Sequence, residues 1–306
     1  MPDVSTATAV EPVLRVIVSS ATHVGGRTGN EDAVFVSELP AVGEGEARSE
    51  AGLLLAVADG MGGYQRGEVA SEMALSIVRE MFDADPAGDA ALLLKQAFRR
   101  ANDLIFENGQ GTTPPAMMGT TLIVAVTHGK YATIASIGDS RVYLARAERI
   151  TQITKDHSLV AEQVAQGAMT EQEARESPHR NILTQALGHR AKLDTKLPNI
   201  FEITLLPEDR LLLVTDGFFD VTPNDDLLAE ILKPDPGQSA ERLVTIAVER
   251  GTTDNVTAIV ATVLSAREAA LPVGAPSGNG FNLVAILITL ITVVAIALVI
   301  LYLALN

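Results

Sequence analysis

Three apolar runs of strand length in this chain end in the same way, with an aspartate next to a glycine or a serine. They are LLLAVADG (53–60), TIASIGDS (133–140) and RLLLVTDG (210–217). A fourth segment, TTDNVTAIVA (252–261), places Asp254 and Asn255 immediately before a similar run. Short apolar runs bounded by turn residues indicate buried β-strands. The chain must therefore fold so that four carboxylates stand at the ends of rigid strands.

Other patterns predict antiparallel strands and amphipathic helices in clusters. Strands are predicted at 52–58, 120–127, 131–137, 141–146, 210–215 and 256–264. The HGK segment at 128–130 separates two of them at hairpin distance. Helices are predicted at 69–82, near 89–108, after a Thr170/Glu173 capping box, at Thr222, and from Ser239 to a stop at 250–251. Because strands and helices do not alternate strictly, the predicted fold class is α+β with antiparallel sheets.

The strand-end aspartates are joined by two further acids in a TGNED segment (28–32). The full set is Glu31, Asp32, Asp59, Asp139, Asp216 and Asp254. Carboxylates gathered beside an apolar core repel one another and become protonated unless a cation neutralises them. Hard divalent ions with oxygen ligands, Mg²⁺ or Mn²⁺, fit that need. An aspartate before a glycine is also ordinary turn chemistry, so the interpretation depends on the set and not on any one member.

Composition and missing motifs exclude several classes of site. The formal charge of -15 and the pI near 4.7 leave no basic stripe for nucleic acid, so no nucleic-acid partner is expected. The absence of cysteine excludes disulfides, thiolate zinc sites and cysteine nucleophiles. The sequence has no P-loop, HExxH or GxSxG signature, which argues against nucleotide binding and against zinc or serine hydrolase chemistry.

The two ends of the chain differ from its body. Leu283 to Leu305 runs for 23 residues without charge, glycine or proline, enough to cross a hydrocarbon core of about 30 Å. We expect a loose leader at 1–12, a folded domain at 13–265, a flexible linker at 266–280 and a transmembrane helix at 281–305. The N-terminus has no secretory signal, so the domain is expected in the cytoplasm, held to membrane lipid by a single-pass C-terminal anchor.

Eight short motifs follow one another along the chain. They are RTGNED (27–32), VADGMGG (57–63), GTT (119–121), IGDSR (137–141), TKDHS (154–158), NILTQALG (181–188), VTDGFFD (214–220) and TDNVT (253–257). In this order they resemble the metal-dependent protein serine/threonine phosphatases of the 2C type, over residues 21–263. The resemblance implies a catalytic domain folded as a four-layer sandwich, two antiparallel β-sheets flanked by helices.

The resemblance also implies the ligands of two metal ions. Asp59 resembles the residue that bridges both ions, together with the carbonyl of Gly60. Further ligands of the first ion are expected at Asp216 and Asp254. Around the second ion, Glu31 and Asp32 are similar to residues that bind or orient its waters. Asp139 resembles the residue that, with Asp216, binds a weaker third ion in bacterial members.

Other positions match or depart from the family pattern. Arg27 matches the position that holds the substrate phosphate, and residues 157–178 lie where the family has a mobile flap. Met61 stands where animal members carry a histidine, so no leaving-group acid is assigned there. Gly29 replaces a frequent asparagine, and the pair at 218–219 is bulkier than usual. We expect these departures to alter the surroundings without removing a ligand.

The implied reaction is hydrolysis of phosphoserine or phosphothreonine in proteins by a hydroxide held between two Mn²⁺ or Mg²⁺ ions. Arg27, Asp59 and Asp216 are the expected catalytic residues. Phosphorylated proteins are the expected partners, with a membrane serine/threonine kinase as one candidate. Two alternatives are a catalytically inactive phosphoprotein-binding module at the membrane and a membrane-anchored cation-binding protein. The intact ligand set argues against the first, and Arg27 against the second.

Overall fold

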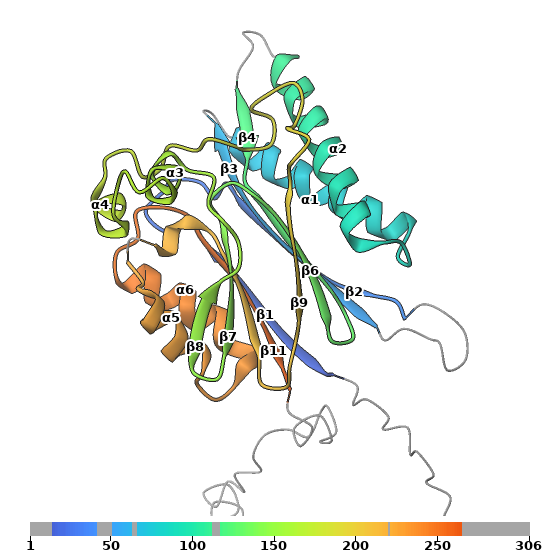
Figure 1. The fold of residues 1–306 in the computed structure, drawn as a ribbon, viewed down its shortest axis with the longest axis vertical. Helices are drawn as coiled ribbons and strands as arrows, with labels where there is room; N and C mark the ends of the chain where they lie inside the picture. Colours follow the sequence, from blue (N-terminus) through green and yellow to red (C-terminus); the bar gives the residue numbers. More distant parts are fainter. Residues whose placement is uncertain (1–13, 42–50, 63–65, 112–116, 220, 265–306) are drawn as a thin grey trace, which may run out of the picture. The chain divides into compact units, whose positions relative to one another are not determined.

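Two antiparallel β-sheets face each other in the part of the chain that the structure describes (Figure 1). In this computed structural model that part comprises residues 14–41, 51–62, 66–111, 117–219 and 221–264. The first sheet runs in the order β1 (Val16–His23), β11 (Val256–Val263), β10 (Arg210–Val214), β7 (Arg141–Arg146) and β8 (Arg149–Gln152). The second runs in the order β2 (Asp32–Leu39), β3 (Gly52–Gly62), β5 (Leu122–His128), β6 (Tyr131–Ile137) and β9 (Asn199–Thr204), with β4 (Met118–Thr120) paired to β3.

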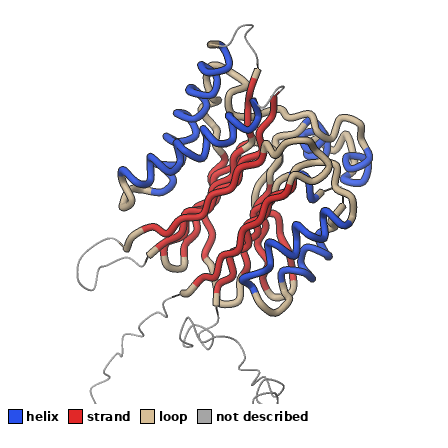
Figure 2. The backbone as a smooth tube through the Cα atoms, turned by 180° about the vertical axis from the view of Figure 1, so that it is seen from behind, coloured by secondary structure: helices blue, strands red, loops and turns tan. Residues whose placement is uncertain are grey.

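Helices cover the outer face of each sheet, as Figure 2 shows from behind. The sheet of β3 is covered by α1 (Arg66–Ala84) and α2 (Ala90–Gln110), and the sheet of β11 by α5 (Asn224–Ile231) and α6 (Ser239–Glu249). Two shorter helices, α3 (Leu159–Ala165) and α4 (Glu171–Glu176), follow β8. The 3-10 turns η2 (Asp216–Phe218) and η3 (Pro236–Gln238) precede α5 and α6. This arrangement confirms the predicted α+β class and the four-layer sandwich.

Strand β3 shows how the layers are held together. Its residues alternate between the two faces of the sheet, as the period of a strand requires. Leu54, Ala56 and Ala58 pack in the cluster under α1 and α2. Leu55 and Val57 pack between the two sheets, against strands of the first sheet. Because both faces are apolar, residues 54–58 of the strand are all buried, and they hold the part of β3 that leads to Asp59.

The helix predicted at 69–82 is confirmed as α1, although Val69, the first residue of the predicted range, is 43% exposed. The contact with the sheet is made one residue further on, by Ala70, Ala74 and Val78, all fully buried. Small alanine side chains let the helix axis come close to the strands, so they form the contact.

Four strands that the sequence did not predict lie at the edges of the two sheets, and a fifth, the short β4, pairs with β3. The six predicted strands are present as β3, β5, β6, β7, β10 and β11. The edge strands β1, β8, β2 and β9 were missed. Each contains several half-buried or exposed residues, as in β9 with its two exposed positions. An edge strand is packed less completely than a central one, so its apolar signature is weaker.

Predictions for the remaining segments have mixed outcomes. The capping box of Thr170 and Glu173 is present and opens α4 inside the predicted flap. Helix α5 begins at Asn224, two residues after the predicted start. The leader (1–12), the linker (266–280) and the helix at 281–305 lie outside the described residues. Within the described ranges, no helix has the length and apolar character needed to cross a membrane.

A buried glutamate links α5 to α6 and gives a pH-dependent prediction. Glu230 accepts hydrogen bonds from Lys233 and from Arg242 Nε at 2.7 Å. Burial raises the pKa of Glu230, but the hydrogen bonds from these two cations outweigh it and bring the pKa below its ordinary value. A carboxyl with a lowered folded-state pKa stabilises the fold above its unfolded pKa, and this is lost as pH falls through the folded value.

Glu230→Gln is therefore expected to lower the free energy of unfolding at pH 7 by about 1–3 kcal/mol. The difference in free energy of unfolding between the variant and the parent chain should shrink once the pH falls below about 4. Urea denaturation at both pH values checks this, with the exposed Glu249→Gln as the matched control. An equal loss at pH 7 and pH 3 would show that packing, not charge, holds this contact.

Candidate functional site

The predicted acidic residues come from both sheets. Asp59, near the end of β3, lies opposite Asp32, at the start of β2, in the antiparallel register. Asp216 begins η2, two residues after the end of β10, and Asp254 lies two residues before β11. Asp139 lies in the turn between β6 and β7. Strand ends of two facing sheets thus supply all five aspartates.

Electrostatic interactions show that these aspartates share one neighbourhood. The pKa of Asp59 lies well above its ordinary value, because of burial first and then the negative charges of Asp32, Asp216, Asp139 and Asp254. Burial raises the pKa of Asp32 to about 7, against hydrogen bonds that lower it. Burial and Asp216 also raise the pKa of Asp139. A nearby cation would reverse these shifts, because it favours the charged form.

Asp32 has one carboxylate oxygen satisfied and one available. Its Oδ2 accepts hydrogen bonds from the hydroxyls of Thr215 at 2.9 Å and Thr257 at 2.6 Å. Its Oδ1 is buried and has no hydrogen-bond partner among the described residues. A buried carboxylate oxygen without a partner is costly unless a cation or an ordered water interacts with it. The orphaned oxygen is therefore a candidate ligand atom.

The GTT motif fixes the backbone of Asp59. The Thr120 hydroxyl and the Thr121 amide both donate to the Asp59 carbonyl at 2.9 Å. The Thr121 hydroxyl accepts from the Asp59 amide at 3.0 Å and lies 2.8 Å from the hydroxyl of Ser140, next to Asp139. The motif therefore connects the Asp59 strand to the Asp139 turn and limits how far the two can separate.

Glycines at 60 and 67 allow the start of α1 to approach β3. A Cβ at Gly60 would lie 2.1 Å from the Gly67 carbonyl oxygen, too close for any larger residue. The Gly60 amide donates to the Glu31 carbonyl at 3.1 Å, and the Ser71 hydroxyl donates to the same carbonyl at 2.7 Å. Burial raises the pKa of the Glu31 carboxyl, although Arg27 and the Gly67 amide act to lower it. Gly60 therefore serves close packing.

Arg27 lies at the exposed edge of this neighbourhood. Its guanidinium donates to Asp254 Oδ2, while the side chain remains 55% exposed. The hydrogen bond to Asp254 raises the pKa of Arg27, as do the charges of Asp216 and Asp59. Arg27 thus combines contact with the carboxylates and access to solvent, which a residue that binds an incoming phosphate requires.

Asn255 holds the loop that carries Arg27 and Glu31, a role that the sequence pattern did not predict. Its Oδ1 accepts from the Glu31 amide at 2.8 Å, and its Nδ2 donates to the carbonyls of Val24 and Gly29 at 2.9 Å. Its own amide donates to Asp254 Oδ1 at 2.8 Å. The side chain is buried. The signal in the sequence was its place directly after Asp254.

Two departures from the family pattern have structural explanations. Phe218 is fully buried in the core under α5 and α6. Phe219 lies beneath Arg141, whose guanidinium carbon is 3.7 Å from the ring centre. Arg141 also binds Asp156 through Nε and Nη2. A Cβ at Gly29 would meet nothing within 4 Å, so that position is open to larger residues.

The donor set fits hard divalent ions that keep part of their water shell. All of the predicted side-chain ligands are carboxylates, which suit Mg²⁺ and Mn²⁺. Among the described residues, no three His, Cys, Asp or Glu side chains converge closely enough to hold one ion. Mg²⁺ typically binds through one or two carboxylates with water completing its shell, and separated carboxylates suit that mode. The individual ligand assignments stay predictions.

Comparison with known proteins gives a family match over most of the chain. Residues 23–246 match the family model described as protein phosphatase 2C. The serine/threonine protein phosphatase PstP of Mycobacterium tuberculosis H37Rv is 36% identical over 239 residues, 78% of this chain and 43% of that protein. The match thus spans less than half the length of this relative. The serine/threonine phosphatase stp of Listeria monocytogenes is 32% identical over 68% of this chain and 83% of its own length.

Solved structures share the fold. The catalytic domain of PstP in complex with two manganese ions matches with a TM-score of 0.69 and 32% identity, over 83% of this chain and 100% of that chain. The serine/threonine phosphatase Stp1 from Staphylococcus aureus matches with a TM-score of 0.73 and 30% identity, over 82% of this chain and 96% of that chain. The β-sandwich described above is therefore shared with these proteins.

Asp59→Asn should stabilise the metal-free protein and weaken its stabilisation by metal. In EDTA the substitution removes a repelled carboxylate, so the melting temperature of the variant should be higher than that of the parent chain. The rise in melting temperature that Mn²⁺ produces should be smaller in the variant, by about 2–4 °C per kcal/mol of lost binding energy. Differential scanning calorimetry checks both, with Asp83→Asn, an exposed aspartate of α1, as the control. An undiminished Mn²⁺ shift would remove Asp59 from the ligand set.

Asn255→Asp should loosen the loop 24–31 while leaving the sheets intact. The variant keeps an acceptor for the Glu31 amide but loses both donors to Val24 and Gly29. Loss of about 1.4 kcal/mol there predicts roughly tenfold faster amide exchange in the loop. Hydrogen–deuterium exchange measures this, with α1 as the internal reference and the exposed Asn181→Asp as the control. Unchanged exchange in the loop would contradict the role.

Proposed function

The chain belongs to the protein phosphatase 2C family, and on that basis we propose that it hydrolyses phosphoserine and phosphothreonine in proteins, with two Mn²⁺ or Mg²⁺ ions as cofactors. A third, weaker ion near Asp139 and Asp216 is part of the same proposal. The relatives support the reaction class and the cofactor, since they are named serine/threonine phosphatases and one solved catalytic domain is described with two manganese ions.

One observation carries the proposal for this chain. Carboxylates from two facing sheets share an electrostatic neighbourhood centred on Asp59, and an exposed arginine, Arg27, pairs with one of them at its edge. The buried carboxylates suit cations, and the arginine suits a phosphate. A site for metal storage alone would not need such an arginine.

The residues have separable tasks in the proposed reaction. When bound, the ions would supply Lewis acidity and a water of lowered pKa for attack on phosphorus. Asp59 would hold them from the rigid end of β3, where Thr120 and Thr121 fix its backbone. Asp32 would offer its unpartnered Oδ1, while Thr215 and Thr257 hold the other oxygen in place. The first two contacts fix the backbone of Asp59, and the last two fix the orientation of the Asp32 carboxylate.

Arg27 would bind the substrate phosphate. Its planar guanidinium can donate two parallel hydrogen bonds to phosphate oxygens, a geometry that lysine lacks. The Asp254 contact holds the guanidinium at the edge of the site, and the loop behind it is fixed by Asn255. The phosphate is therefore expected to meet a positioned side chain, which reduces the entropy cost of binding.

The same proposal places the enzyme on the cytoplasmic face of a membrane. The uncharged 23-residue run from Leu283 to Leu305 supports an anchor. Phosphorylated proteins are then the substrates, and a co-anchored serine/threonine kinase is a candidate because tethering raises the local concentration of such partners. Membrane fractionation of cells expressing the chain, with and without residues 281–305, tests the location. Equal solubility of both forms would contradict it.

Phosphate release from a phosphothreonine peptide by the purified 306-residue chain tests the reaction. Turnover should require Mn²⁺ or Mg²⁺ and cease in EDTA. Asp216→Asn should lower kcat by about 100-fold or more, and Arg27→Ala should lower kcat/KM by about 10- to 100-fold, mainly through KM. The exposed Arg99→Ala is the matched control. A folded chain that binds Mn²⁺ without turnover would favour the inactive phosphoprotein-binding module instead.

A further inference from the structure

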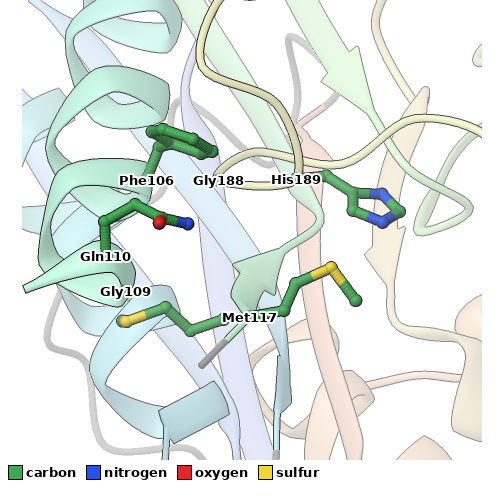
Figure 3. A pocket seen from close by; sticks show the side chains of 7 residues that line it. Phe106, Gly109, Gln110, Met117, Gly188 and His189 are labelled. Carbon is green, nitrogen blue, oxygen red and sulfur yellow. The ribbon is translucent and has the colours of Figure 1, made fainter. Parts of the chain in front are cut away.

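A pocket lies between the end of α2 and the start of β4, apart from the carboxylates. Its cavity volume is about 130 Å³, and its lining comprises Phe106, Gly109, Gln110, Met117, Met118, Gly188 and His189. Figure 3 shows Phe106 and Gln110 on one side of the pocket and His189 on the opposite side, with Met117 labelled between them. Met117 is 67% exposed, more than any other large apolar side chain noted among the described residues.

The wall of this pocket is tied to the Asp59 strand by backbone hydrogen bonds. Thr120, whose hydroxyl donates to the Asp59 carbonyl, exchanges two backbone hydrogen bonds with Leu187, at 3.0 and 3.1 Å. Met118 pairs with Gly62, three residues beyond Asp59. At about 3.3 Å per residue along a strand, the pocket lies roughly 10 Å from Asp59. An extended peptide covers that distance in about three residues.

A buried asparagine fixes the loop that forms the other side of the pocket. Asn102 on α2 is fully buried. Its Oδ1 accepts from the Gly188 amide at 3.1 Å, and its Nδ2 donates to the Arg190 carbonyl at 3.1 Å. Gly188 itself has a positive φ of 79° and no space for a Cβ beside Ile105. The loop is thus held in one conformation beside the pocket.

The same loop carries positive charge in a strongly acidic protein. Residues 177–197 contain four basic side chains, Arg180, Arg190, Lys192 and Lys196, and one acid, Asp194, whereas the whole chain has a net charge of -15. Arg190, Lys192 and Lys196 are exposed. In the described part of the chain none of these three forms an ion pair with an acid. Two exposed acids, Asp103 and Glu107, lie on α2. Neither forms an ion pair with these three basic residues, and Asp103 instead accepts a hydrogen bond from Asn102.

We propose that this pocket and the basic loop bind the substrate phosphoprotein beside its phosphorylated residue. An apolar side chain about three residues from the phosphoresidue occupies the pocket, and acidic side chains beyond it face Arg190, Lys192 and Lys196. The proposal rests on the proposed phosphatase function, since it takes the phosphoresidue to sit at the Asp59 neighbourhood. Charge complementarity selects an acidic segment, because the remainder of this acidic protein repels one.

Two peptides and two matched variants of the 306-residue chain test the proposal. Both peptides carry a non-hydrolysable phosphonate analogue of phosphoserine, and both have Leu at the third position before and after this residue. Outside the two leucines, one peptide has Glu residues and the other has Ser residues. The first variant is Arg190→Glu, Lys192→Glu, Lys196→Glu. The second reverses three exposed basic residues elsewhere, Lys95→Glu, Arg99→Glu, Arg149→Glu, and so changes the net charge equally. Fluorescence anisotropy in Mn²⁺ at low salt measures Kd, and turnover of p-nitrophenyl phosphate is recorded in parallel.

The first variant, with the loop charges reversed, should raise the Kd of the Glu-flanked peptide by about tenfold or more and the Kd of the Ser-flanked peptide by less than about twofold. The control variant should weaken both peptides slightly and equally, and p-nitrophenyl phosphate turnover should stay within about twofold. Met117→Ser should weaken both peptides, because it removes apolar contact at the pocket.

Equal weakening by both triple variants would overturn the proposal, since net charge alone would then explain binding. Binding of the same proteins to vesicles of anionic phospholipid is measured as well. If reversing the loop charges abolishes vesicle binding and leaves peptide binding unchanged, the proposal is overturned and the loop is assigned to a membrane surface. Absence of p-nitrophenyl phosphate turnover in the parent chain, with the peptide pattern as expected, would instead contradict the proposed catalysis and leave the binding surface supported.

Discussion

Repulsion among buried and half-buried carboxylates is the constraint on which the rest of this structure depends. Asp59 has four aspartates within electrostatic reach, and its pKa is raised by burial and by all of them. Such an arrangement is held only by a rigid frame, because flexible loops would move the charges apart. Strands buried on both faces supply the frame, and hydroxyls of Thr120, Thr121, Thr215 and Thr257 fix the acids on it.

Central strands of the fold could be predicted from the sequence, and edge strands could not. Strands β3, β5 and β6 are packed on both sides, so their apolar runs are long and bounded by turns. The edge strands β1, β2, β8 and β9 pack less fully, and their mixed sequences resemble loops. Helix α1 shows a related limit: periodicity located the helix, but it did not show that Ala70 is buried while its neighbour Val69 is exposed.

The acids of the candidate site could be predicted because each follows or precedes an apolar run. Their supporting residues could not, since a hydrogen bond joins positions far apart in the chain. Asn255 reaches Val24 across 231 positions, and Thr257 reaches Asp32 across 225. Pairings at such separations follow from the register of strands, which composition and local periodicity do not determine. The pocket beside Met117 was missed for the same reason, because it joins α2, β4 and a distant loop.

The position of β11 between β1 and β10 has a consequence for how the chain folds. Within the described residues, the first strand, β1, pairs along its whole length with the last, β11, from Val16 with Val263 to His23 with Val256. During synthesis the sheet therefore stays open until β11 has left the ribosome, with β1 and β10 as unpaired edges. Contacts of such high sequence separation form late. Nascent chains of this protein would then need protection from aggregation until the last strand arrives.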